Sequence, residues 1–534
     1  MPGPDRKPGA PAPGASPDAH RPAGAPAVGL AALADSAGLV LAPRAGDAVV
    51  VSGITLDSRA VRAGDLFAAV PGAHLHRADF AAAAVAAGAV AILTDVRGRQ
   101  RAAATGVPVL VAPDPRAVLG AVAATVYGHP AGHLLTLGIT GTNGKTTTAY
   151  LLEAGLRAAS FETGLIGTIE TRVGGLAIPS ERTTPEATDL HALLATMVER
   201  GVGALAMEVS SHALALSRVN GVVFDVAMFT NLGSDHLDFH AGPAEYFRAK
   251  ALLFTPAHSR AAVVNLDDPY GRRLADAPNV PTTTYAGSGD PAADWRAEDV
   301  VTGPEGSTFT AVGQGGVGVP CTVWLPGRFN VDNALGALAT LVTAGVRADV
   351  AADGLAACRG VPGRVERVEA GQPFLALVDY AHTPEAVQTL LEAVRPLVPG
   401  RLVVVIGCGG DRDRAKRAPI GAAAARGSDV LVVTDDNPRT EDPAAIRAAV
   451  LEGARSVDAA HRADVVEVGG RGAAVAAAVA LAEPGDGVVV AGKGHEQGQE
   501  IAGTVLPFDD RTVLRAAIVG RSGESAGLAG ALTW

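Results

Sequence analysis

Short apolar runs, each followed by a polar or glycine-rich loop, recur along most of this chain. Runs without polar alternation are typical of strands buried on both faces of a parallel sheet. Helical patterns separate several of them, for example at 81–87 and 246–254, and this alternation predicts an α/β fold. The predicted strands lie at 49–51, 54–56, 90–93, 109–111, 134–137, 204–208, 226–229, 375–379, 402–406, 430–434 and 488–491.

Changes in composition divide the chain into three domains with a tail at each end. The 534 residues fit about three domains of roughly 100–200 residues each. Residues 1–27 are rich in Pro, Ala and Gly and hold too few large apolar groups for a core, so we expect a disordered tail. We expect a small domain at 28–132, a central domain at 133–367 and a third at 368–520, then a flexible tail at 521–534.

A glycine-rich loop near the start of the central domain carries the clearest chemical signal. The segment Gly141-Thr-Asn-Gly-Lys-Thr146 joins a predicted strand to a predicted helix. Backbone N–H groups in such a turn face an anion, the helix dipole favours it, and Lys145 neutralises its charge. Thr146 is placed to reach a magnesium ion. The glycine spacing is shorter than in the standard P-loop, because Ile139 stands where the first glycine would be.

Polar groups also follow other strands of the central domain. Glu208 ends an apolar strand, where phosphoryl-transfer folds hold magnesium with a carboxylate. Two His and two Asp crowd the loop at 235–240, which favours ligand binding over a structural role. Lys250 lies between apolar residues of a helix, and the residues alone predict an exposed lysine. Asn330 and Asn333 have the spacing to face one ligand from a helix start.

Loops with charges of both signs follow the strands of the third domain. They carry Arg412 and Arg439 together with Asp436 and Glu496. Open α/β sheets bind ligands at this end of their strands, and a ligand with its own carboxylates and ammonium groups fits the set. The alternative is a solvated rim of loops. In the first domain, Asp57-Ser-Arg59 either holds a polar ligand or forms a capped turn.

Composition narrows the partners and the location. The formal net charge of −11 argues against non-specific binding to nucleic acid or to an anionic membrane. The longest apolar run, at 80–94, is shorter than the roughly 20 residues that a membrane-spanning helix needs. Three scattered cysteines indicate neither a zinc site nor a disulfide framework, and no signal peptide is recognisable. We therefore expect a cytoplasmic protein that binds neither nucleic acid nor a membrane. We also expect small-molecule substrates and a monomer.

Two classes of function fit these features. A phosphate loop, a metal-binding strand end and a separate site for a charged small molecule favour ATP-driven joining of two substrates. The alternative is a nucleotide-dependent switch or transport ATPase whose third domain binds a partner. A switch needs segments that sense the γ-phosphate and a partner surface, whereas the informative loops here are polar and lie at strand ends.

The motifs together resemble those of the Mur ligase family over about residues 54–518. The resemblance rests on the phosphate loop and on Glu208-Val-Ser-Ser-His212, Asp235-His-Leu-Asp238, Asp379-Tyr-Ala-His-Thr-Pro384, Asp436-Asn-Pro-Arg439 and Gly492-Lys-Gly-His-Glu496. It implies a small α/β uridine-binding domain, a central P-loop ATPase-like domain and a C-terminal Rossmann-like domain for an amino acid. It also implies an ATP- and Mg²⁺-dependent amide ligase of peptidoglycan synthesis, which serves cell-wall biogenesis, cell shape and cell division.

The form of one motif bears on the substrate. Asp436-Asn-Pro-Arg439 resembles the members that add diaminopimelate to the D-Glu of UDP-N-acetylmuramoyl-L-Ala-D-Glu through an acyl phosphate. Diaminopimelate differs from lysine by one carboxylate, and Arg binds a carboxylate through two parallel hydrogen bonds. The alternative is a sister ligase that adds L-lysine or D-alanyl-D-alanine, and Arg439 argues against both.

The resemblance also assigns roles to single positions. Lys145, Lys250 and His236 would be the catalytic residues. The ATP site would comprise Gly141, Thr142, Asn143, Gly144, Lys145, Thr146, Thr147, Asn330, Asn333 and Arg364. The UDP-linked substrate would contact Leu56, Ser58, Thr183, Thr184, Ser210 and Arg218. Diaminopimelate would contact Arg412, Asp436, Asn437, Pro438, Arg439, Gly492 and Glu496.

For Lys250 the resemblance replaces the exposed-lysine interpretation. The position matches a lysine that family members carry as a carbamate formed with CO₂, which turns a cation into an anion able to bind a second Mg²⁺. The metal ligands would be Thr146, Glu208, His236 and the carbamate of Lys250. Two places depart from the family pattern: His76 and Arg77 replace an Asp-Gly pair, and Leu216 replaces a Gln that contacts substrate.

Overall fold

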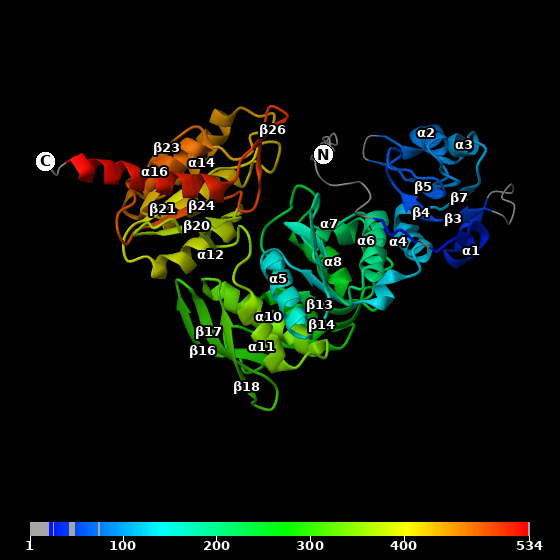
Figure 1. The fold of residues 1–534 in the computed structure, drawn as a ribbon, viewed down its shortest axis with the longest axis horizontal. Helices are drawn as coiled ribbons and strands as arrows, with labels where there is room; N and C mark the ends of the chain where they lie inside the picture. The colour runs from blue at the N-terminus through cyan, green and yellow to red at the C-terminus, as the bar shows by residue number, and fades with distance from the viewer. Residues whose placement is uncertain (1–20, 25, 42–48, 73–74, 532–534) are drawn as a thin grey trace.

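A computed structural model describes residues 21–24, 26–41, 49–72 and 75–531. Most of the predicted N-terminal tail, 1–20 and 25, lies outside the described residues. Three large sheets with helices packed on them follow one another along the chain, so the predicted three-domain α/β architecture is confirmed (Figure 1). The predicted domain borders stay predictions. No helix in the described ranges has the length and apolar character needed to cross a membrane.

The first sheet has five strands in the order β2-β7-β6-β5-β4. Strands β4 to β7 are parallel, and every residue of β4, β5 and β6 is buried, which explains their apolar sequence. The strands are β2 (Val40–Leu41), β4 (Gly53–Thr55), β5 (Asp65–Ala69), β6 (Ala91–Thr94) and β7 (Val109–Val111), with a separate pair, β1 (Val28–Gly29) and β3 (Val50–Val51). The helices are α1 (Leu30–Ser36), α2 (Ala81–Ala86), α3 (Arg99–Ala103) and α4 (Pro115–Val126).

The central sheet has eleven strands in the order β11-β10-β9-β12-β8-β13-β14-β15-β16-β17-β18. Strand β8 lies between β12 and β13 and is parallel to both, so the phosphate loop that follows β8 lies between the loops after its two neighbours. The strands are β8 (Leu135–Thr140), β9 (Thr163–Ile166), β10 (Glu170–Val173), β11 (Leu176–Pro179), β12 (Ala204–Glu208), β13 (Phe224–Phe229), β14 (Ser259–Asn265), β15 (Thr282–Ala286), β16 (Trp295–Gly303), β17 (Gly306–Val312) and β18 (Gly318–Val323).

Helices cover this sheet, and a long one follows the phosphate loop directly. They are α5 (Lys145–Ala158), α6 (Ala187–Glu199), α7 (Ser211–Ala215), α8 (Pro243–Ala251), α9 (Pro269–Asp276), α10 (Arg328–Thr343) and α11 (Ala348–Ala357). Antiparallel strands extend the sheet on both sides, β10 and β11 on one and β17 and β18 on the other. The apolar-run pattern predicted none of these four strands, because their residues alternate in burial or carry many polar groups.

The third sheet has six strands in the order β19-β20-β24-β21-β22-β23, and all but β19 are parallel. Strand β24 lies between β20 and β21, which brings the loops after β21, β22 and β24 to one edge. The strands are β19 (Glu366–Arg367), β20 (Leu375–Asp379), β21 (Leu402–Ile406), β22 (Val430–Val433), β23 (Asp464–Glu467) and β24 (Gly487–Ala491), with a hairpin of β25 (Gly498–Ile501) and β26 (Thr504–Pro507).

The helices of the third domain are α12 (Pro384–Val394), α13 (Arg417–Gly427), α14 (Pro443–Arg455), α15 (Arg471–Leu481) and α16 (Asp510–Ala531). Helix α16 continues beyond 520, so the predicted start of the flexible tail at 521 falls inside a helix. Short 3₁₀ helices lie at Arg77–Phe80, Pro130–His133, Leu252–Phe254, Arg395–Leu397 and Ala459–His461.

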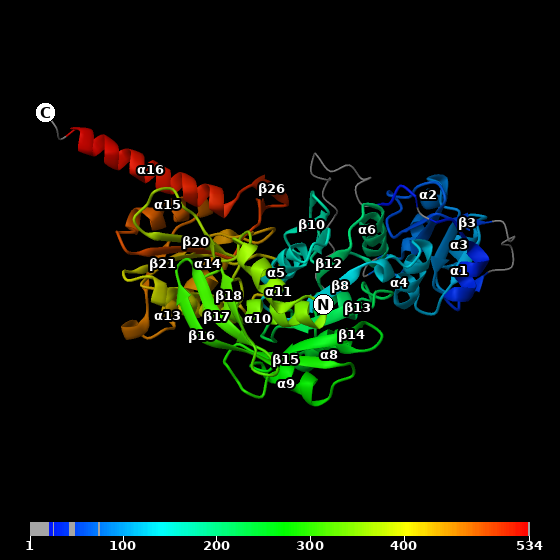
Figure 2. The ribbon, with the colours of Figure 1, turned by 60° about the horizontal axis from the view of Figure 1, so that its bottom comes forward.

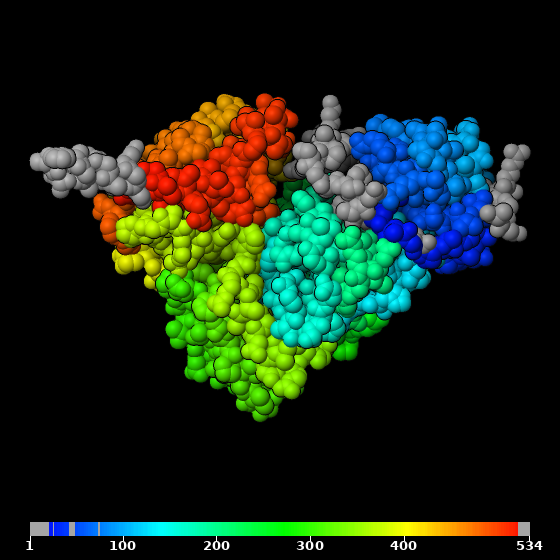
Figure 3. All heavy atoms as spheres, in the orientation of Figure 1, coloured from blue at the N-terminus to red at the C-terminus, as the bar shows by residue number. Residues whose placement is uncertain are grey.

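The central domain lies between the other two. Figures 1 and 2 both show the first domain on one side of it and the third on the other. The space-filling view in Figure 3 shows the cyan part of the central domain reaching toward both neighbours. The central domain is therefore the one that adjoins both of the others.

Candidate active site

The phosphate loop turns back on itself between β8 and α5. Gly144 has φ 88°, and a Cβ there would lie 2.3 Å from Oδ1 of Asn333, so this position requires glycine. The Lys145 Nζ donates to the carbonyls of Gly141 and Thr142, both at 2.9 Å. Burial lowers the pKa of Lys145. The loop thus places a cation and the N-terminus of a 14-residue helix at one point, which suits a phosphate group.

Glu208 ends β12 directly beside this loop, with 1% of its surface exposed. Its Oε2 accepts from the hydroxyls of Thr146 and Thr168, each at 3.0 Å, and its Oε1 accepts from the Thr168 N–H at 2.7 Å. Arg364, from the segment before the third sheet, donates to the Thr146 hydroxyl at 3.0 Å. The predicted residues Thr146, Glu208 and Arg364 are therefore brought together.

The donor set around Glu208 fits Mg²⁺. A carboxylate and a hydroxyl are hard oxygen ligands, and Mg²⁺ is commonly held by one or two carboxylates with substrate phosphates completing the shell. The described part of the chain holds no cluster of three or more His, Cys, Asp or Glu able to bind a metal by itself. The arrangement therefore suits a Mg²⁺ ion that arrives with a nucleotide, and Thr146 and Glu208 are the residues that would hold it.

Lys250 lies on α8 and is buried, with 1% of its surface exposed. Its Nζ donates to the Gly141 carbonyl at 2.7 Å and lies 4.5 Å from the centre of the Tyr246 ring. The exposed lysine that the residues alone predicted is wrong, because α8 packs onto the phosphate loop. Burial, and then the nearby charge of Lys145, lower the pKa of Lys250 well below its usual value. A neutral amine, the form that reacts with CO₂, is favoured there.

His236 occupies a strained position in the loop after β13. Its φ is 56°, which is uncommon for a residue other than glycine. Its Nε2 lies 3.4 Å from Oδ2 of Asp235, and its ring lies 4.7 Å from that of His212. Among the described residues, no hydrogen bond joins His236 to Glu208 or Lys250. The four metal ligands that the family resemblance implied thus surround the phosphate loop without forming one set.

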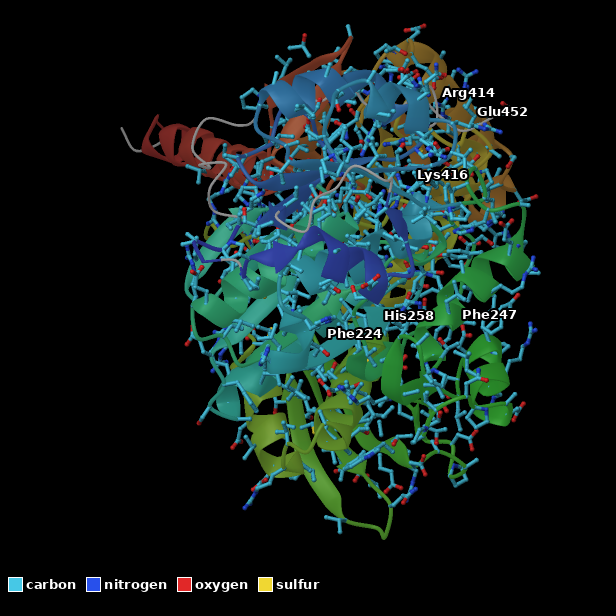
Figure 4. All side chains as sticks on the ribbon, turned by 90° about the vertical axis from the view of Figure 1, so that its right-hand side faces the viewer. Phe224, Phe247, His258, Arg414, Lys416 and Glu452 are labelled. Carbon is cyan, nitrogen blue, oxygen red and sulfur yellow. The ribbon has the colours of Figure 1, made fainter. Side chains whose placement is uncertain are left out.

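Charges from the third domain reach this loop. Burial raises the pKa of Asp235, but His236, His382 and Lys416 outweigh it and lower that pKa overall. Figure 4 shows Lys416 between Arg414 of its own domain and Phe247 of the central domain. The third domain therefore contributes positive charge to the central site.

Four of the residues predicted for the UDP-linked substrate lie in the central domain, and most of them are close to Glu208. The Thr184 hydroxyl donates to the Glu208 carbonyl at 2.8 Å and accepts from the Ser210 N–H at 3.1 Å. The Thr183 hydroxyl lies 3.0 Å from that of Thr168. Arg218 pairs with Glu186 at 3.0 Å. Thr183, Thr184 and Ser210 thus lie beside Thr168 or Glu208, and Arg218 is bound to Glu186, two residues after Thr184 in the chain.

Two further predicted contacts lie in the first domain. Leu56 is buried, and its carbonyl accepts from Arg77 at 3.3 Å. Ser58 lies in the turn after β4, beside an ion pair of Asp57 and Arg59 with Nη2 to Oδ2 at 2.6 Å. The capped-turn interpretation of this segment accounts for that pair, and Ser58 stays a predicted substrate contact.

Asn330 and Asn333 are both buried near the start of α10. The Asn333 amide donates to Oδ1 of Asn330 at 3.1 Å, and Asn330 donates to the Pro326 carbonyl at 2.8 Å. Because Asn333 also packs against Gly144, this pair of asparagines contacts the phosphate loop and helps to hold its conformation.

The loops after β22 and β24 meet in the third domain. Asn437 donates to Oε2 of Glu496 at 2.8 Å, and a Cβ at Gly492 would lie 2.9 Å from Oδ2 of Asp436. Lys493 is fully buried and donates to Asn437 at 3.0 Å and to Glu496 at 2.8 Å. The solvated-rim alternative does not fit side chains that are bonded to one another in this way.

Arg439 and Arg412 approach this meeting point from adjacent loops. Arg439 has φ 53°, donates to the Gly410 carbonyl at 2.7 Å and pairs with Glu500 at 3.2 Å. A Cβ at Gly409 would lie 3.0 Å from Nη1 of Arg439 and 3.9 Å from Cγ of Arg412. Both arginines and Pro438 thus lie at the same edge of the sheet as Glu496.

Comparison with known proteins places this geometry in a family. Residues 50–127 match the model of the Mur ligase family catalytic domain, 139–341 the Mur ligase middle domain, and 363–494 the Mur ligase glutamate ligase domain. The chain is 60% identical over 489 residues to the UDP-N-acetylmuramoyl-L-alanyl-D-glutamate–2,6-diaminopimelate ligase of Streptomyces coelicolor, covering 92% of this chain and 96% of that one. The chain belongs to the Mur ligase family.

Other Mur ligases extend the comparison. The protein of the same name from Corynebacterium efficiens is 50% identical, covering 88% of this chain and 90% of the other. A solved structure of a ligase of that name matches with a TM-score of 0.66 at 32% identity and covers 93% of this chain and 99% of its own. MurF from Acinetobacter baumannii matches at 19% identity with a TM-score of 0.64, over 88% and 96%, which shows the shared fold alone.

One departure from the Mur ligase pattern has a structural explanation. His76 caps the short helix at Arg77–Phe80 by accepting from the Ala78 N–H at 3.1 Å, and its other ring nitrogen lies 2.9 Å from Asp95. Arg77 reaches back to the Leu56 carbonyl. Leu216 only ends the short helix α7.

The sequence analysis missed several residues that hold the site of this Mur ligase. Glu186 joins Arg116 of the first domain, at 3.2 Å, to Arg218 of the second. Lys493 lies within the motif Gly492-Lys-Gly-His-Glu496, but the family resemblance assigned it no role. No sequence signal identified the contacts of Glu186 with Arg116 or of Lys493 with Asn437, because these partners lie 70 and 56 residues apart in the chain.

Proposed function

We propose that this Mur ligase joins diaminopimelate to the D-Glu of UDP-N-acetylmuramoyl-L-Ala-D-Glu at the expense of ATP. The observation that carries the proposal is the amino-acid site at the edge of the third sheet. Arg439 lies there next to Arg412, on the loop whose Asn437 binds Glu496, and a pair of guanidinium groups suits a substrate with one more carboxylate than lysine. The 60% identity to a relative of that name supports the same assignment.

The phosphate loop accounts for the first half-reaction. A carboxylate oxygen of D-Glu attacks the γ-phosphorus of ATP, and the bond from that phosphorus to the bridging β-phosphate oxygen breaks. ADP is released, and the substrate now carries an acyl phosphate. Lys145 and the N-terminus of α5 stabilise the charge that spreads over the transferred group. Thr146 and Glu208 would hold Mg²⁺, which adds charge neutralisation at the phosphate oxygens. The loop residues Gly141 to Thr147 and the Asn330–Asn333 pair form the proposed nucleotide site.

The third domain supplies the nucleophile for the second half-reaction. An amino group of diaminopimelate attacks the acyl carbonyl, phosphate leaves, and the amine proton is released as the amide forms. Arg412, Gly492, Glu496 and the Asp436–Arg439 loop would orient this amino acid. Arg364, in the segment that leads into the third sheet, contacts Thr146, so closure of the third domain onto the central one would complete the site and shield the acyl phosphate from water.

A carbamate on Lys250 is part of the proposal. The neutral amine attacks CO₂, an N–C bond forms, and one proton leaves to solvent, so the side chain becomes an anion. Burial of Lys250 favours the neutral amine that reacts with CO₂, and its Nζ lies 2.7 Å from the Gly141 carbonyl, so the group lies at the loop that would receive phosphate. His236 would contribute to the same metal shell after the loop at 235–240 closes. Thr183, Thr184, Ser210 and Arg218 would hold the UDP-linked substrate, with Leu56 and Ser58 toward its uridine.

The carbamate is tested by chemical rescue. Lys250→Ala should lose most phosphate release, and a small carboxylate such as acetate should restore part of it. Lys145→Ala is the matched control, because acetate cannot replace its cation. Absence of rescue in Lys250→Ala, with Mg²⁺ binding intact by titration, would contradict the carbamate.

The activity itself is tested by phosphate release with ATP and the UDP-linked dipeptide. We expect turnover with diaminopimelate and little with L-lysine or D-alanyl-D-alanine. Turnover that is fastest with lysine or with the D-alanine dipeptide would assign the chain to a sister reaction. We also propose that the protein is located in the cytoplasm, where its nucleotide substrates are made. We propose that it is a monomer, which size-exclusion chromatography tests.

A further inference from the structure

Arg471 is the largest fully buried side chain in the described ranges. It begins α15 and pairs with Asp510, the first residue of α16. The Nε and Nη2 atoms of Arg471 contact the two carboxylate oxygens of Asp510, both at 2.7 Å, and neither side chain is exposed. The reaction described above uses neither residue.

The guanidinium has two further contacts, and both lead to the amino-acid site. Nη1 donates to the Asp435 carbonyl at 3.3 Å, and Nη2 donates to the Ala491 carbonyl at 2.8 Å. Asp435 directly precedes the Asp436–Arg439 loop, and Ala491 directly precedes the loop from Gly492 to Glu496. One side chain thus ties the starts of both loops to the same buried point.

The two loops also pack closely against each other, so a shift of one would displace the other. A Cβ at Gly492 would lie 2.9 Å from Oδ2 of Asp436, so the loops have little room to shift independently. The Asp435 carboxylate is itself held by Arg447 and by the N–H of Gly470, the residue before Arg471. The backbones that present the amino-acid contacts are therefore fixed from below.

We infer that Arg471 is a positioning residue that sets amino-acid affinity by holding these two loops in register. The inference rests on the proposed function, because it assumes that the two loops bind the incoming amino acid. Four of the five guanidinium N–H groups are used, in the planar geometry that only Arg offers. Lysine could pair with Asp510 but could not reach both carbonyls at once.

The competing interpretation is that the pair with Asp510 serves only the core. A purely structural ion pair can often be replaced by apolar residues of similar volume without loss of stability. The double variant Arg471→Met with Asp510→Leu therefore removes both buried charges together. It also leaves the carbonyls of Asp435 and Ala491 without their donor, which is the change to be tested.

The experiment measures KM for diaminopimelate and for ATP by phosphate release, alongside thermal unfolding. A misplacement of about 1 Å in a positioned group can cost around 100-fold. We expect KM for diaminopimelate to rise about 10- to 100-fold in the double variant, with KM for ATP unchanged. Arg471→Lys, which keeps the charge opposite Asp510, should show the same selective rise and decides the matter if the double variant does not fold.

A control pair, more exposed than Arg471 and Asp510, lies at the opposite end of the same sheet. Arg401 pairs with Asp486 at 3.0 Å, next to the first residues of β21 and β24. Arg401→Met with Asp486→Asn should lower stability and leave KM for diaminopimelate unchanged.

Two results would overturn the inference: a folded Arg471 variant with unchanged KM for diaminopimelate, or equal losses for both substrates. Absence of diaminopimelate-dependent turnover in the unmodified protein would instead overturn the proposed function.

Discussion

Replacing Glu208 by Gln tests the metal role of the central site with the smallest possible change in shape. The Glu208 carboxylate accepts three hydrogen bonds from Thr146 and Thr168. In Gln the amide oxygen can keep the Thr168 N–H, and the amide NH₂ then faces the two hydroxyls. The Thr168 hydroxyl can reverse its direction, because its neighbour Thr183 is also a hydroxyl that can donate or accept.

The expected loss of stability follows from these contacts. The Thr146 hydroxyl already accepts from Arg364, so it has limited freedom to accept from a new donor as well. Charge-assisted hydrogen bonds become neutral ones, and each difference is worth about 1 kcal/mol. We therefore expect the free energy of unfolding to fall by about 1–2 kcal/mol.

The expected loss of activity is larger. Loss of one preorganised electrostatic group at a reacting centre costs about 10²–10³ in kcat, or about 3–4 kcal/mol of transition-state stabilisation. If Glu208 holds Mg²⁺, the variant should also need a higher Mg²⁺ concentration for half-maximal phosphate release. The two effects separate because the stability loss leaves the folded protein in large excess.

The measurements are urea unfolding and phosphate release at a series of Mg²⁺ concentrations. Glu153→Gln is the matched control. Like Glu208, Glu153 is buried in the central domain; it lies on α5, the helix that follows the phosphate loop, and pairs with Arg172 at 2.8 Å. It should lose stability and keep its Mg²⁺ dependence. Wild-type turnover and Mg²⁺ dependence in Glu208→Gln would refute the metal role.

Three other substitutions test separate parts of the structure. Arg439→Ala should raise KM for diaminopimelate far more than KM for ATP in steady-state kinetics; an equal rise would remove its assigned role. Gly138→Ala places a Cβ 2.9 Å from the Phe224 ring (labelled in Figure 4), and overpacking should cost about 1–3 kcal/mol in urea unfolding, partly recovered by adding Phe224→Leu. Burial lowers the pKa of His191 from 6.5 to about 4. As the pH is lowered from about 6.5 to about 4, the unfolded chain therefore binds the proton before the folded protein does, and the free energy of unfolding falls. His191→Gln should reduce that fall by up to about 1.4 kcal/mol per pH unit, and an unchanged pH dependence of the urea midpoint would contradict it.

The sequence predicted many of the parallel strands, because burial on both faces favours continuous apolar runs, but it did not predict the parallel strands β5, β9, β14, β15 and β23. The strands at 109–111, 204–208, 375–379 and 402–406 have the predicted bounds. The antiparallel strands β17 and β18 escaped prediction, since one side of that hairpin is exposed and its residues alternate in burial. Periodicity identifies a strand reliably only where its environment is uniform.

The chemistry of single loops was also readable from sequence. A turn that wraps phosphate needs glycine at strained positions and a lysine at the helix start, and the chain shows both in one short segment. The strand-end position of Glu208 likewise followed from an apolar run that stops at a carboxylate. Such features are local, so the order of residues determines them.

Burial and partnership were decided only by the tertiary structure. The residues next to Lys250 in the sequence predict an exposed lysine on a helix. In the structure Lys250 is buried, because α8 packs on a loop 109 residues away in the chain. Arg471 gave no sequence signal, although it joins its own helix to two loops and to one other helix, α16, in space. Which charges meet depends on how distant elements pack, and no local pattern contains that information.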